Sequence, residues 1–158
     1  QAAGTDFALL RCSSVRNAYP PGPLTADDVR GMNFCGIDSV VRLELTGADL
    51  RAVLECGARD AYYLLTLSGG RVTYDGRRPQ GQRVVELDPV EPDRVYSVAC
   101  SEILARGAAG FRLLAGRPYE VTSTNVGELL YTHVTAGQRI KPATDGRLRI
   151  IAALPRER

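Results

Sequence analysis

A short polar loop near the start of the chain holds the residues whose types and spacing suggest binding chemistry. A strand-like segment over residues 5–10 runs into Arg11-Cys12-Ser13-Ser14 and then Val15-Arg16. Loops that follow strands often carry functional groups. The guanidinium of Arg16 suits phosphate because its planar fork donates two charge-assisted hydrogen bonds. Residue type alone leaves two interpretations of Arg16 open: a phosphate-binding group, or an arginine that is solvated or paired with a carboxylate.

Groups able to perform catalysis are scarce in the rest of the chain. His133 is the only histidine, whereas two-metal phosphoester hydrolysis needs several histidines and carboxylates around its ions. No Cys-x-x-Cys pair is present, so a zinc site of the usual spacing is not expected. A Ser/His/Asp triad or a cysteine nucleophile would also need His133, and Gly-x-Ser-x-Gly and Walker-type loops are absent. We predict that His133 packs on the apolar side of the last helix, and that this chain binds no metal.

Size and composition predict one ordinary globular domain over residues 1–158. The chain is 44% hydrophobic and 24% charged, and its net charge of +2 comes from scattered residues, which argues against nucleic-acid binding. No run approaches the roughly 20 apolar residues of a membrane-spanning helix. The first residues lack the features of a signal peptide, although one could have been removed earlier. The even cysteine count permits two disulfides in three connectivities but does not require them: Cys12, Cys35, Cys56 and Cys100.

Capping residues and hydrophobic spacing predict four helices. Thr25 followed by two acidic residues marks a short helix that ends near Gly31. The clearest amphipathic helix opens at Thr46-Gly47 and stops near Gly57. A short helix follows Ser101, whose hydroxyl is expected to cap it, and the last helix begins at about residue 124.

Alternating apolar residues and turn signals predict strands between these helices. The expected strands cover residues 5–10, 40–45, 64–67, 71–74, 84–87, 95–98, 119–122 and 147–151. Hairpins link them more often than crossovers do. The pattern therefore predicts an α+β fold or a mixed sheet.

The order of these segments resembles the C-terminal domain of the 5'-nucleotidase and UDP-sugar hydrolase family, and the likeness extends over nearly the whole chain. Seven collinear stretches carry it: Asp6-Phe7-Ala8-Leu9-Leu10 through Val15-Arg16, Gly22-Pro23-Leu24-Thr25 with Asp28-Val29, Leu43-Glu44-Leu45-Thr46-Gly47 with Leu50, Ser68-Gly69-Gly70-Arg71-Val72-Thr73-Tyr74-Asp75, Gly81-Gln82-Arg83-Val84, Val95-Tyr96-Ser97-Val98, and Leu104-Ala105-Arg106-Gly107 with Gly110-Phe111.

The resemblance implies a four-layer α/β/β/α domain that supplies the substrate-binding half of a two-domain enzyme. Its partner in the family is an N-terminal, calcineurin-like metallophosphoesterase domain with two divalent metals, and no such domain is present in these 158 residues. Family members are commonly secreted, periplasmic or surface-anchored, so the resemblance also implies an extracytoplasmic location.

The resemblance also implies which residues bind substrate. The family's nucleotide-binding loop Asn-Gly-Gly-Gly-Ile-Arg is matched by residues 11–16, where only Arg16 is unchanged, and it places Arg11, Ser13 and Ser14 at the site. Phe34 matches a phenylalanine that stacks on the base, with Gly36 close by, and stacking contributes about 1–3 kcal/mol. An ordinary core position is the alternative for Phe34.

Two departures from the family pattern bear on the ligand. The second stacking phenylalanine of the family is replaced by Ile103, and the aspartate that holds the nucleoside is replaced by Ala109. Losing a charged hydrogen-bond acceptor costs on the order of 1.5–3 kcal/mol. These changes suggest weakened recognition of AMP-type nucleotides or a different ligand. Cys12 and Cys35 are placed at the cleft by the same resemblance, as a disulfide, as free thiols or as inert small residues.

Two functional hypotheses follow. In the first, the chain recognises a nucleotide or related small anion for a phosphoester hydrolase and needs residues outside this sequence for catalysis. In the second, it is a degenerate scaffold or interaction module that no longer uses its cleft for nucleotides. Arg16 and Phe34 favour the first hypothesis, whereas Ile103 and Ala109 favour the second.

Overall fold

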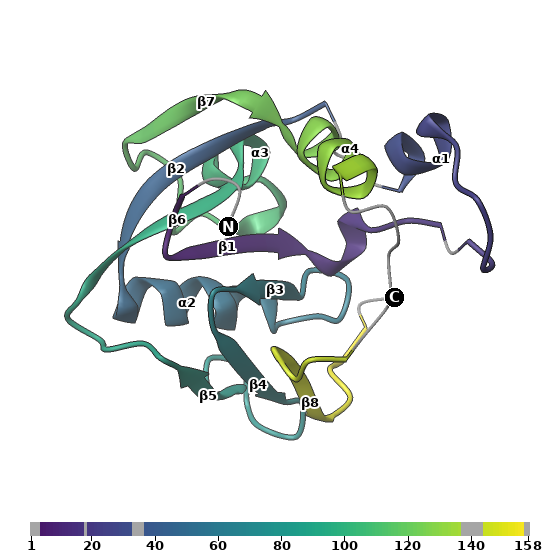
Figure 1. Ribbon diagram of the computed structural model, residues 1–158. Coiled ribbons are helices and arrows are strands. Elements are labelled where there is room, and N and C mark those ends of the chain that lie inside the picture. Colours follow the sequence, from purple (N-terminus) through teal and green to yellow (C-terminus); the bar gives the residue numbers. More distant parts are fainter. Residues whose placement is uncertain (1–3, 18, 33–36, 137–143, 157–158) are drawn as a thin grey trace.

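The computed structural model describes residues 4–17, 19–32, 37–136 and 144–156. Its strands form a five-stranded sheet in the order β3-β1-β6-β2-β7 and a three-stranded sheet in the order β5-β4-β8 (Figure 1). The strands are β1 (Phe7–Arg11), β2 (Ser39–Thr46), β3 (Leu65–Ser68), β4 (Arg71–Asp75), β5 (Val84–Asp88), β6 (Val95–Ser101), β7 (Tyr119–Asn125) and β8 (Leu148–Ala152). The helices are α1 (Ala26–Gly31), α2 (Gly47–Gly57), α3 (Glu102–Ala105) and α4 (Val126–Ala136), with short 3-10 turns η1 (Cys12–Ser14) and η2 (Ala108–Gly110).

Strand β2 occupies an interior position of the larger sheet, and one of its faces is apolar. Val41, Leu43 and Leu45 are buried, whereas Arg42 and Glu44 between them are exposed. This alternation is the one that the sequence predicts for a strand with one face on the core. Antiparallel neighbours flank β2 on both sides, β6 on one and β7 on the other.

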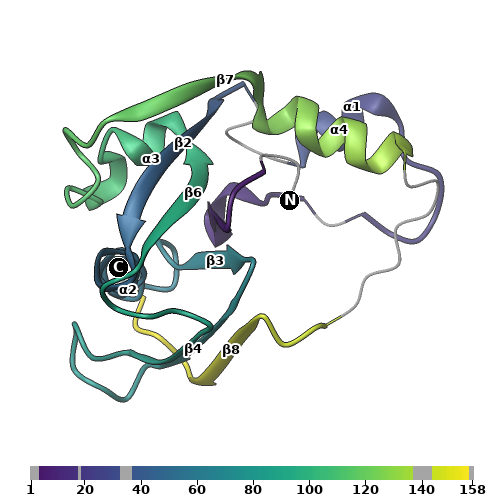
Figure 2. The ribbon, with the colours of Figure 1, turned by 60° about the vertical axis from the view of Figure 1, so that its left-hand side comes forward.

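Helix α2 lies between the two sheets (Figure 2). Its inward face buries Leu50, Val53 and Leu54, which the periodicity of the sequence places on one side. On the side of the smaller sheet, the Glu55 carboxylate accepts hydrogen bonds from the backbone N–H groups of Arg83 and Val84, at 3.0 and 2.7 Å. The helix therefore bridges both sheets.

The first turn of α2 is closed by polar contacts. The Thr46 hydroxyl accepts a hydrogen bond from the backbone N–H of Asp49 at 3.1 Å, as its capping role predicts. The N–H groups of Gly47 and Ala48 donate to the carbonyls of Arg94 and Pro92, both at 2.9 Å. The loop that leads into β6 therefore satisfies donors that a helix leaves unpaired at its start.

The turn after β3 moves the chain from the larger sheet to the smaller one. Tyr74 on β4 is fully buried, and its hydroxyl donates to the carbonyl of Leu65 on β3 at 3.1 Å. Burial raises the pKa of this phenol far above its ordinary value. Side chains from both sheets join in one hydrophobic cluster.

Helices α1 and α4 lie side by side at one end of the larger sheet (Figures 1 and 2). A capping box closes the start of α1, with reciprocal bonds between Thr25 and Asp28. The guanidinium of Arg30 lies 5.1 Å from the centroid of the Tyr131 ring on α4. The capping signal at Thr25 thus predicted the start of α1 correctly.

One prediction for α4 is wrong. His133 is exposed, rather than packed on the apolar side of the helix. In the last turn, residues 132–136, only Val134 is half-buried, so this turn extends beyond the packed part of α4. Leu129, one turn earlier, lines a cavity against the sheet.

The α+β prediction is confirmed, with a mixed five-stranded sheet, a second sheet and helices packed against them. Within the described ranges, no helix combines the length and apolar character needed to cross a bilayer.

The close approach of α2 to the loop before β6 makes a prediction for Gly47→Ala. A Cβ atom at position 47 would lie 2.1 Å from the Glu91 carbonyl oxygen and 2.7 Å from a methyl group of Val90. Because backbone must move to relieve this clash, we expect a loss of about 3 kcal/mol in the free energy of unfolding. Urea denaturation of the two proteins measures it.

Gly31→Ala is the matched control. Its Cβ would meet only the side-chain ends of Tyr19 and Asn17, at 3.4 and 3.7 Å. The free energy of unfolding should then change by less than about 1 kcal/mol. Equal losses at both glycines would contradict the close packing of α2 on this loop.

An ion pair near the start of α2 makes a prediction about acid stability. Arg117 donates to both carboxylate oxygens of Asp49, at 3.0 and 2.8 Å, and thereby lowers the pKa of Asp49 below its ordinary value of 3.8. A depressed carboxyl pKa contributes stability that is present above the unfolded pKa and is lost as the pH falls through the folded one. Each side chain is about one-third exposed, so Asp49→Asn should cost only about 0.5 kcal/mol at neutral pH.

The difference between Asp49→Asn and wild type should disappear in strong acid, below the folded pKa, as measured by urea denaturation across the acidic range. The control places Asp49→Asn in an Arg117→Met background, where the cost at neutral pH should shrink. A cost that is independent of both pH and Arg117 would show that the ion pair contributes nothing.

Candidate functional site

One end of the larger sheet gathers several of the predicted site residues. Strands β1 and β6 are parallel neighbours, with Phe7 opposite Val98 and Ala8 opposite Ala99, so their carboxyl ends lie at the same end of the sheet. The antiparallel pairing of β2 with β6 puts the start of β2 there, and the pairing of β7 with β2 adds the end of β7. We call this the site end of the sheet. Carboxyl ends of parallel strands are common positions for ligand sites in α/β proteins.

The turn after β1 carries the predicted phosphate-binding loop. Arg11 is the last residue of β1, and the N–H of Cys12 donates to the carbonyl of Leu64 at 2.8 Å. The N–H of Val15 returns to the carbonyl of Cys12 at 3.2 Å and closes η1. The N–H of Arg16 then donates to the carbonyl of Met32 at 2.8 Å. Backbone contacts therefore tie this turn to the start of β3 and the end of α1.

Side chains on this turn differ in their access to solvent. Arg16 is exposed, whereas Arg11 and Ser13 are half-buried and Ser14 is buried. The Ser13 hydroxyl oxygen is buried without a hydrogen-bond partner among the described residues. Exposure makes Arg16 the member of the turn most able to meet a ligand.

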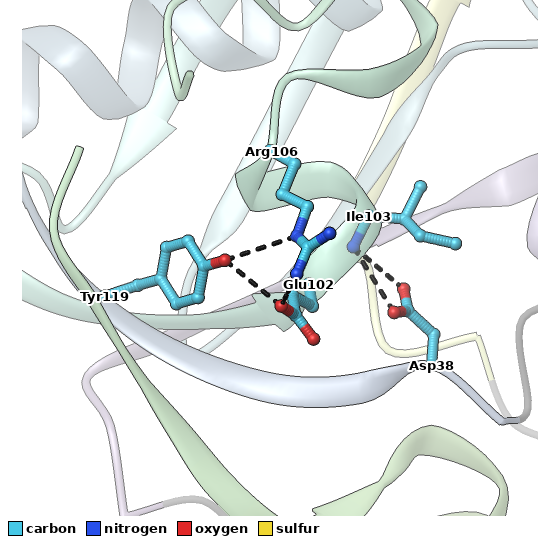
Figure 3. Close-up of polar contacts among 5 residues, drawn as sticks. All are labelled: Asp38, Glu102, Ile103, Arg106 and Tyr119. Atoms are coloured by element: carbon cyan, nitrogen blue, oxygen red, sulfur yellow. Dashed lines mark hydrogen bonds and ion pairs between the residues drawn. The ribbon is translucent and has the colours of Figure 1, made fainter. Parts of the chain in front are cut away.

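Ile103 lies at the same end, on the helix that follows β6. This residue is 44% exposed, and its N–H donates to both carboxylate oxygens of Asp38, at 3.3 and 3.1 Å (Figure 3). The Ser101 hydroxyl accepts a hydrogen bond from the N–H of Leu104 at 3.4 Å, which confirms its predicted capping role. Asp38 and Ser101 together fix the start of α3, and Ile103 projects from it as an aliphatic surface.

A charged cluster beside Ile103 was missed by the sequence reasoning. The Glu102 carboxylate accepts hydrogen bonds from Arg106 at 2.5 Å and from the Tyr119 hydroxyl at 3.1 Å (Figure 3). Arg106 and then Tyr119 hold the pKa of Glu102 below its ordinary value. The i,i+4 spacing of Glu102 and Arg106 signals part of this cluster. Tyr119 joins it only through the fold, because β7 lies on the far side of β2.

Two cavities lie near these residues. One, of about 430 Å³, is beside η1 and is lined by Cys12, Ser13, Asp60, Ala61, Tyr62 and Arg156. The other has a volume of about 230 Å³. Strands β1 and β6 form one side of it and helix α4 the other, and its lining is largely apolar. Neither cavity has Arg16 or Ile103 in its lining.

The remaining predicted site residues are Phe34 and Gly36, which lie outside the described residues, as does Cys35. The turn after β1 carries Arg11, Ser13, Ser14 and Arg16, and the parallel pairing of β1 with β6 puts Ile103 just beyond the end of the adjacent strand. Ala109, where the family pattern has aspartate, lies in η2, the turn after α3.

The cysteines in the described part of the chain are free thiols. Cys12, Cys56 and Cys100 form no disulfide with one another. Burial raises the pKa of the Cys12 thiol, and burial with the nearby Asp38 charge raises the pKa of Cys100 to about 12. Both thiols are therefore protonated at neutral pH, which disfavours a nucleophilic role.

In the described part of the chain, metal-ligating side chains are not grouped into a metal centre. Within the described ranges, no group of three or more His, Cys, Asp or Glu side chains is placed to hold an ion. A two-metal phosphoesterase site needs a set of such ligands for each of its two ions. The described side chains of the site end include the Arg16 guanidinium, the Glu102 carboxylate and the aliphatic surface of Ile103.

Known proteins resemble this chain in both sequence and fold. It is 26% identical over 134 residues to a 5'-nucleotidase from Diplobatis ommata, an alignment that covers 72% of this chain and 23% of that protein. A 5'-nucleotidase precursor from Thermus thermophilus superposes with a TM-score of 0.85 at 26% identity, over 94% of this chain and 32% of the other. NAD nucleotidase from Haemophilus influenzae shares the fold, with a TM-score of 0.81 at 16% identity over 94% of this chain and 30% of the other.

The chain thus spans between about a quarter and a third of the length of these relatives. The family model described as "5'-nucleotidase, C-terminal domain" matches residues 1–116, which is more than half of the chain. Together with the two-sheet fold, this match establishes that the chain belongs to the 5'-nucleotidase family and corresponds to its C-terminal domain.

Proposed function

We propose that this chain is the substrate-recognition domain of a 5'-nucleotidase-type phosphoester hydrolase and binds a nucleotide or a related small anion. The observation that carries the proposal is the turn after β1, where exposed Arg16 follows a backbone held at both ends by hydrogen bonds. A guanidinium on a fixed turn favours bidentate binding of a phosphate. Arg11, Ser13 and Ser14 belong to the same turn, and Ser13 also borders a cavity.

The base or sugar of the ligand is proposed to lie near Ile103. This exposed isoleucine is held at the start of α3, at the same end of the sheet as the β1 turn. Phe34 and Gly36 complete the proposed site. An aliphatic side chain excludes water from one ring face but lacks the electrostatic complementarity of an aromatic stack. The site should therefore bind AMP more weakly than a clamp of two aromatic rings would.

Catalysis is proposed to depend on a second domain. In this proposal residues 1–158 form one domain, and an N-terminal metallophosphoesterase domain with two divalent metals completes the enzyme. The relatives, which are three to four times longer than their matched part, support this arrangement. The metals would polarise the phosphate and supply an activated water, while this chain holds the nucleotide in place. An extracytoplasmic location is proposed by analogy with the family.

A second candidate function is a scaffold or interaction module that has lost nucleotide recognition. The specific observations that favour it are Ile103 and Ala109 at positions where the family pattern has an aromatic ring and a carboxylate. Nucleotide titration separates the two candidates, because a scaffold requires no saturable site.

The first prediction for the proposed ligand site concerns Arg16→Ala. Isothermal titration calorimetry with AMP should show saturable binding to the wild-type chain, and the substitution should weaken it at least about tenfold, since a charge-assisted hydrogen-bonded pair is lost. The ionic strength must be equal in both titrations because salt screens contacts to phosphate.

The matched control is Arg149→Ala, which removes an exposed arginine from β8 in the smaller sheet. It should leave the affinity for AMP unchanged. No binding of AMP by the wild-type chain would favour the scaffold. If Arg16→Ala binds AMP as tightly as the wild-type chain does, Arg16 does not contribute to the site.

The second prediction concerns Ile103→Phe. An aromatic ring at this exposed position should improve the affinity for AMP by about tenfold, since a stacked ring contributes about 1–3 kcal/mol. The same titration measures it. Ile151→Phe on β8, also an exposed isoleucine, serves as the control and should have no effect. Higher affinity for AMP in both variants would indicate nonspecific stacking. Unchanged affinity in both variants would show that Ile103 does not contact the ligand.

A further inference from the structure

Arg59, just after α2, contacts two segments that are far apart in the sequence. One guanidinium nitrogen, Nη1, donates to the carbonyl of Cys56 at 2.9 Å, and Nη2 donates to the carbonyl of Ala109. The guanidinium also lies over two aromatic rings, 3.9 Å from the centroid of Tyr63 and 5.4 Å from that of Phe111. One half-buried side chain thus joins the end of α2 to the loop over residues 107–111.

The backbone of this loop needs outside support. Ala109 has φ 55°, in the left-handed region, and lies between Gly107 and Gly110, which have φ 81° and 82°. A residue with a Cβ atom enters this region only against a steric cost, so surrounding contacts must hold it there. Arg59 binds the carbonyl of Ala109 itself, and the Cys56 thiol donates to the next carbonyl, that of Gly110, at 3.4 Å.

The segments on either side of Arg59's contacts belong to both parts of the candidate site. The loop over residues 107–111 follows α3, which begins at Glu102 at the site end and carries Ile103. The segment after Arg59 leads to Leu64, whose carbonyl accepts the hydrogen bond from Cys12 in the β1 turn at 2.8 Å. Arg59 is therefore bonded directly to the loop that follows α3, and residues 60–64 connect it along the chain to the contact with the β1 turn.

We propose that Arg59 is a positioning residue, which keeps Ala109 in its left-handed conformation and so fixes the loop over residues 107–111 relative to the β1 turn. Its effect on ligand affinity rests on the proposed function, whereas its effect on the loop does not. Lysine cannot replace it, because a single ammonium group cannot donate to two carbonyls in this fork geometry while lying flat on the Tyr63 ring.

The test uses Arg59→Met, Arg59→Lys and the double variant Arg59→Met with Ala109→Gly. Hydrogen–deuterium exchange of the peptide covering residues 107–111 reports on the loop, and calorimetric titration with AMP reports on the site. Both single variants should exchange several times faster in this peptide and bind AMP about fivefold more weakly, the effect of one lost hydrogen bond. Ala109→Gly should restore much of both properties, since glycine adopts a positive φ without a Cβ clash.

Arg51→Met is the matched control, because Arg51 also donates to a backbone carbonyl, that of Val84 at 2.7 Å, but on the side of the smaller sheet. Exchange in residues 107–111 and affinity for AMP should both stay at wild-type values in this variant. If Arg59 only stabilised the fold as a whole, Arg59→Met would also lower the thermal stability and speed exchange. Glycine at position 109 would then not restore the wild-type values.

Unchanged exchange in Arg59→Met, or no recovery in the double variant, would overturn the proposal. Faster exchange with unchanged affinity for AMP would overturn the link between the loop and the site. If the wild-type chain binds no AMP, the proposed function fails by itself, and the exchange measurement still decides whether Arg59 holds the loop.

Discussion

The parallel pairing of β1 with β6 is the constraint on which the candidate site depends. Only two residue pairs define its register, yet they set the carboxyl ends of both strands side by side. The turn after one strand carries Arg16, and the helix after the other begins at Glu102 and carries Ile103. Between them in sequence the described residues form α1, α2 and the strands β2 to β5, whose packing must hold this register. The site is therefore assembled by the whole core rather than by one local motif.

Local features of the chain could be read from its sequence because they depend on near neighbours. Alternation in β2 and the caps at Thr25, Thr46 and Ser101 each rely on residues within one turn or one strand. Strand order could not be read in this way, because β1 and β6 are separated by more than eighty residues. The bond between Tyr119 and Glu102 was invisible for the same reason. The exposed position of His133 depends on where neighbouring elements end, which periodicity does not reveal.

The proposed function divides the chemistry of hydrolysis between two parts of an enzyme. This chain supplies a fixed turn with a guanidinium, an aliphatic surface and a braced loop, and its described residues offer no set of metal ligands. Such a division separates the groups that select a ligand from those that cleave it. In that proposal, substitutions such as isoleucine at position 103 alter the preference for ligands without touching the reactive groups.

Helix α2 has a consequence for how the molecule opens. Its inward face packs into the core of the larger sheet, and its Glu55 and Arg51 side chains bind the backbone of β5 in the smaller one. Neither sheet can separate from the helix without exposing apolar surface or leaving buried polar groups unpaired. The smaller sheet, with only three strands, should therefore unfold together with the larger one, so that the described fold melts as one cooperative unit.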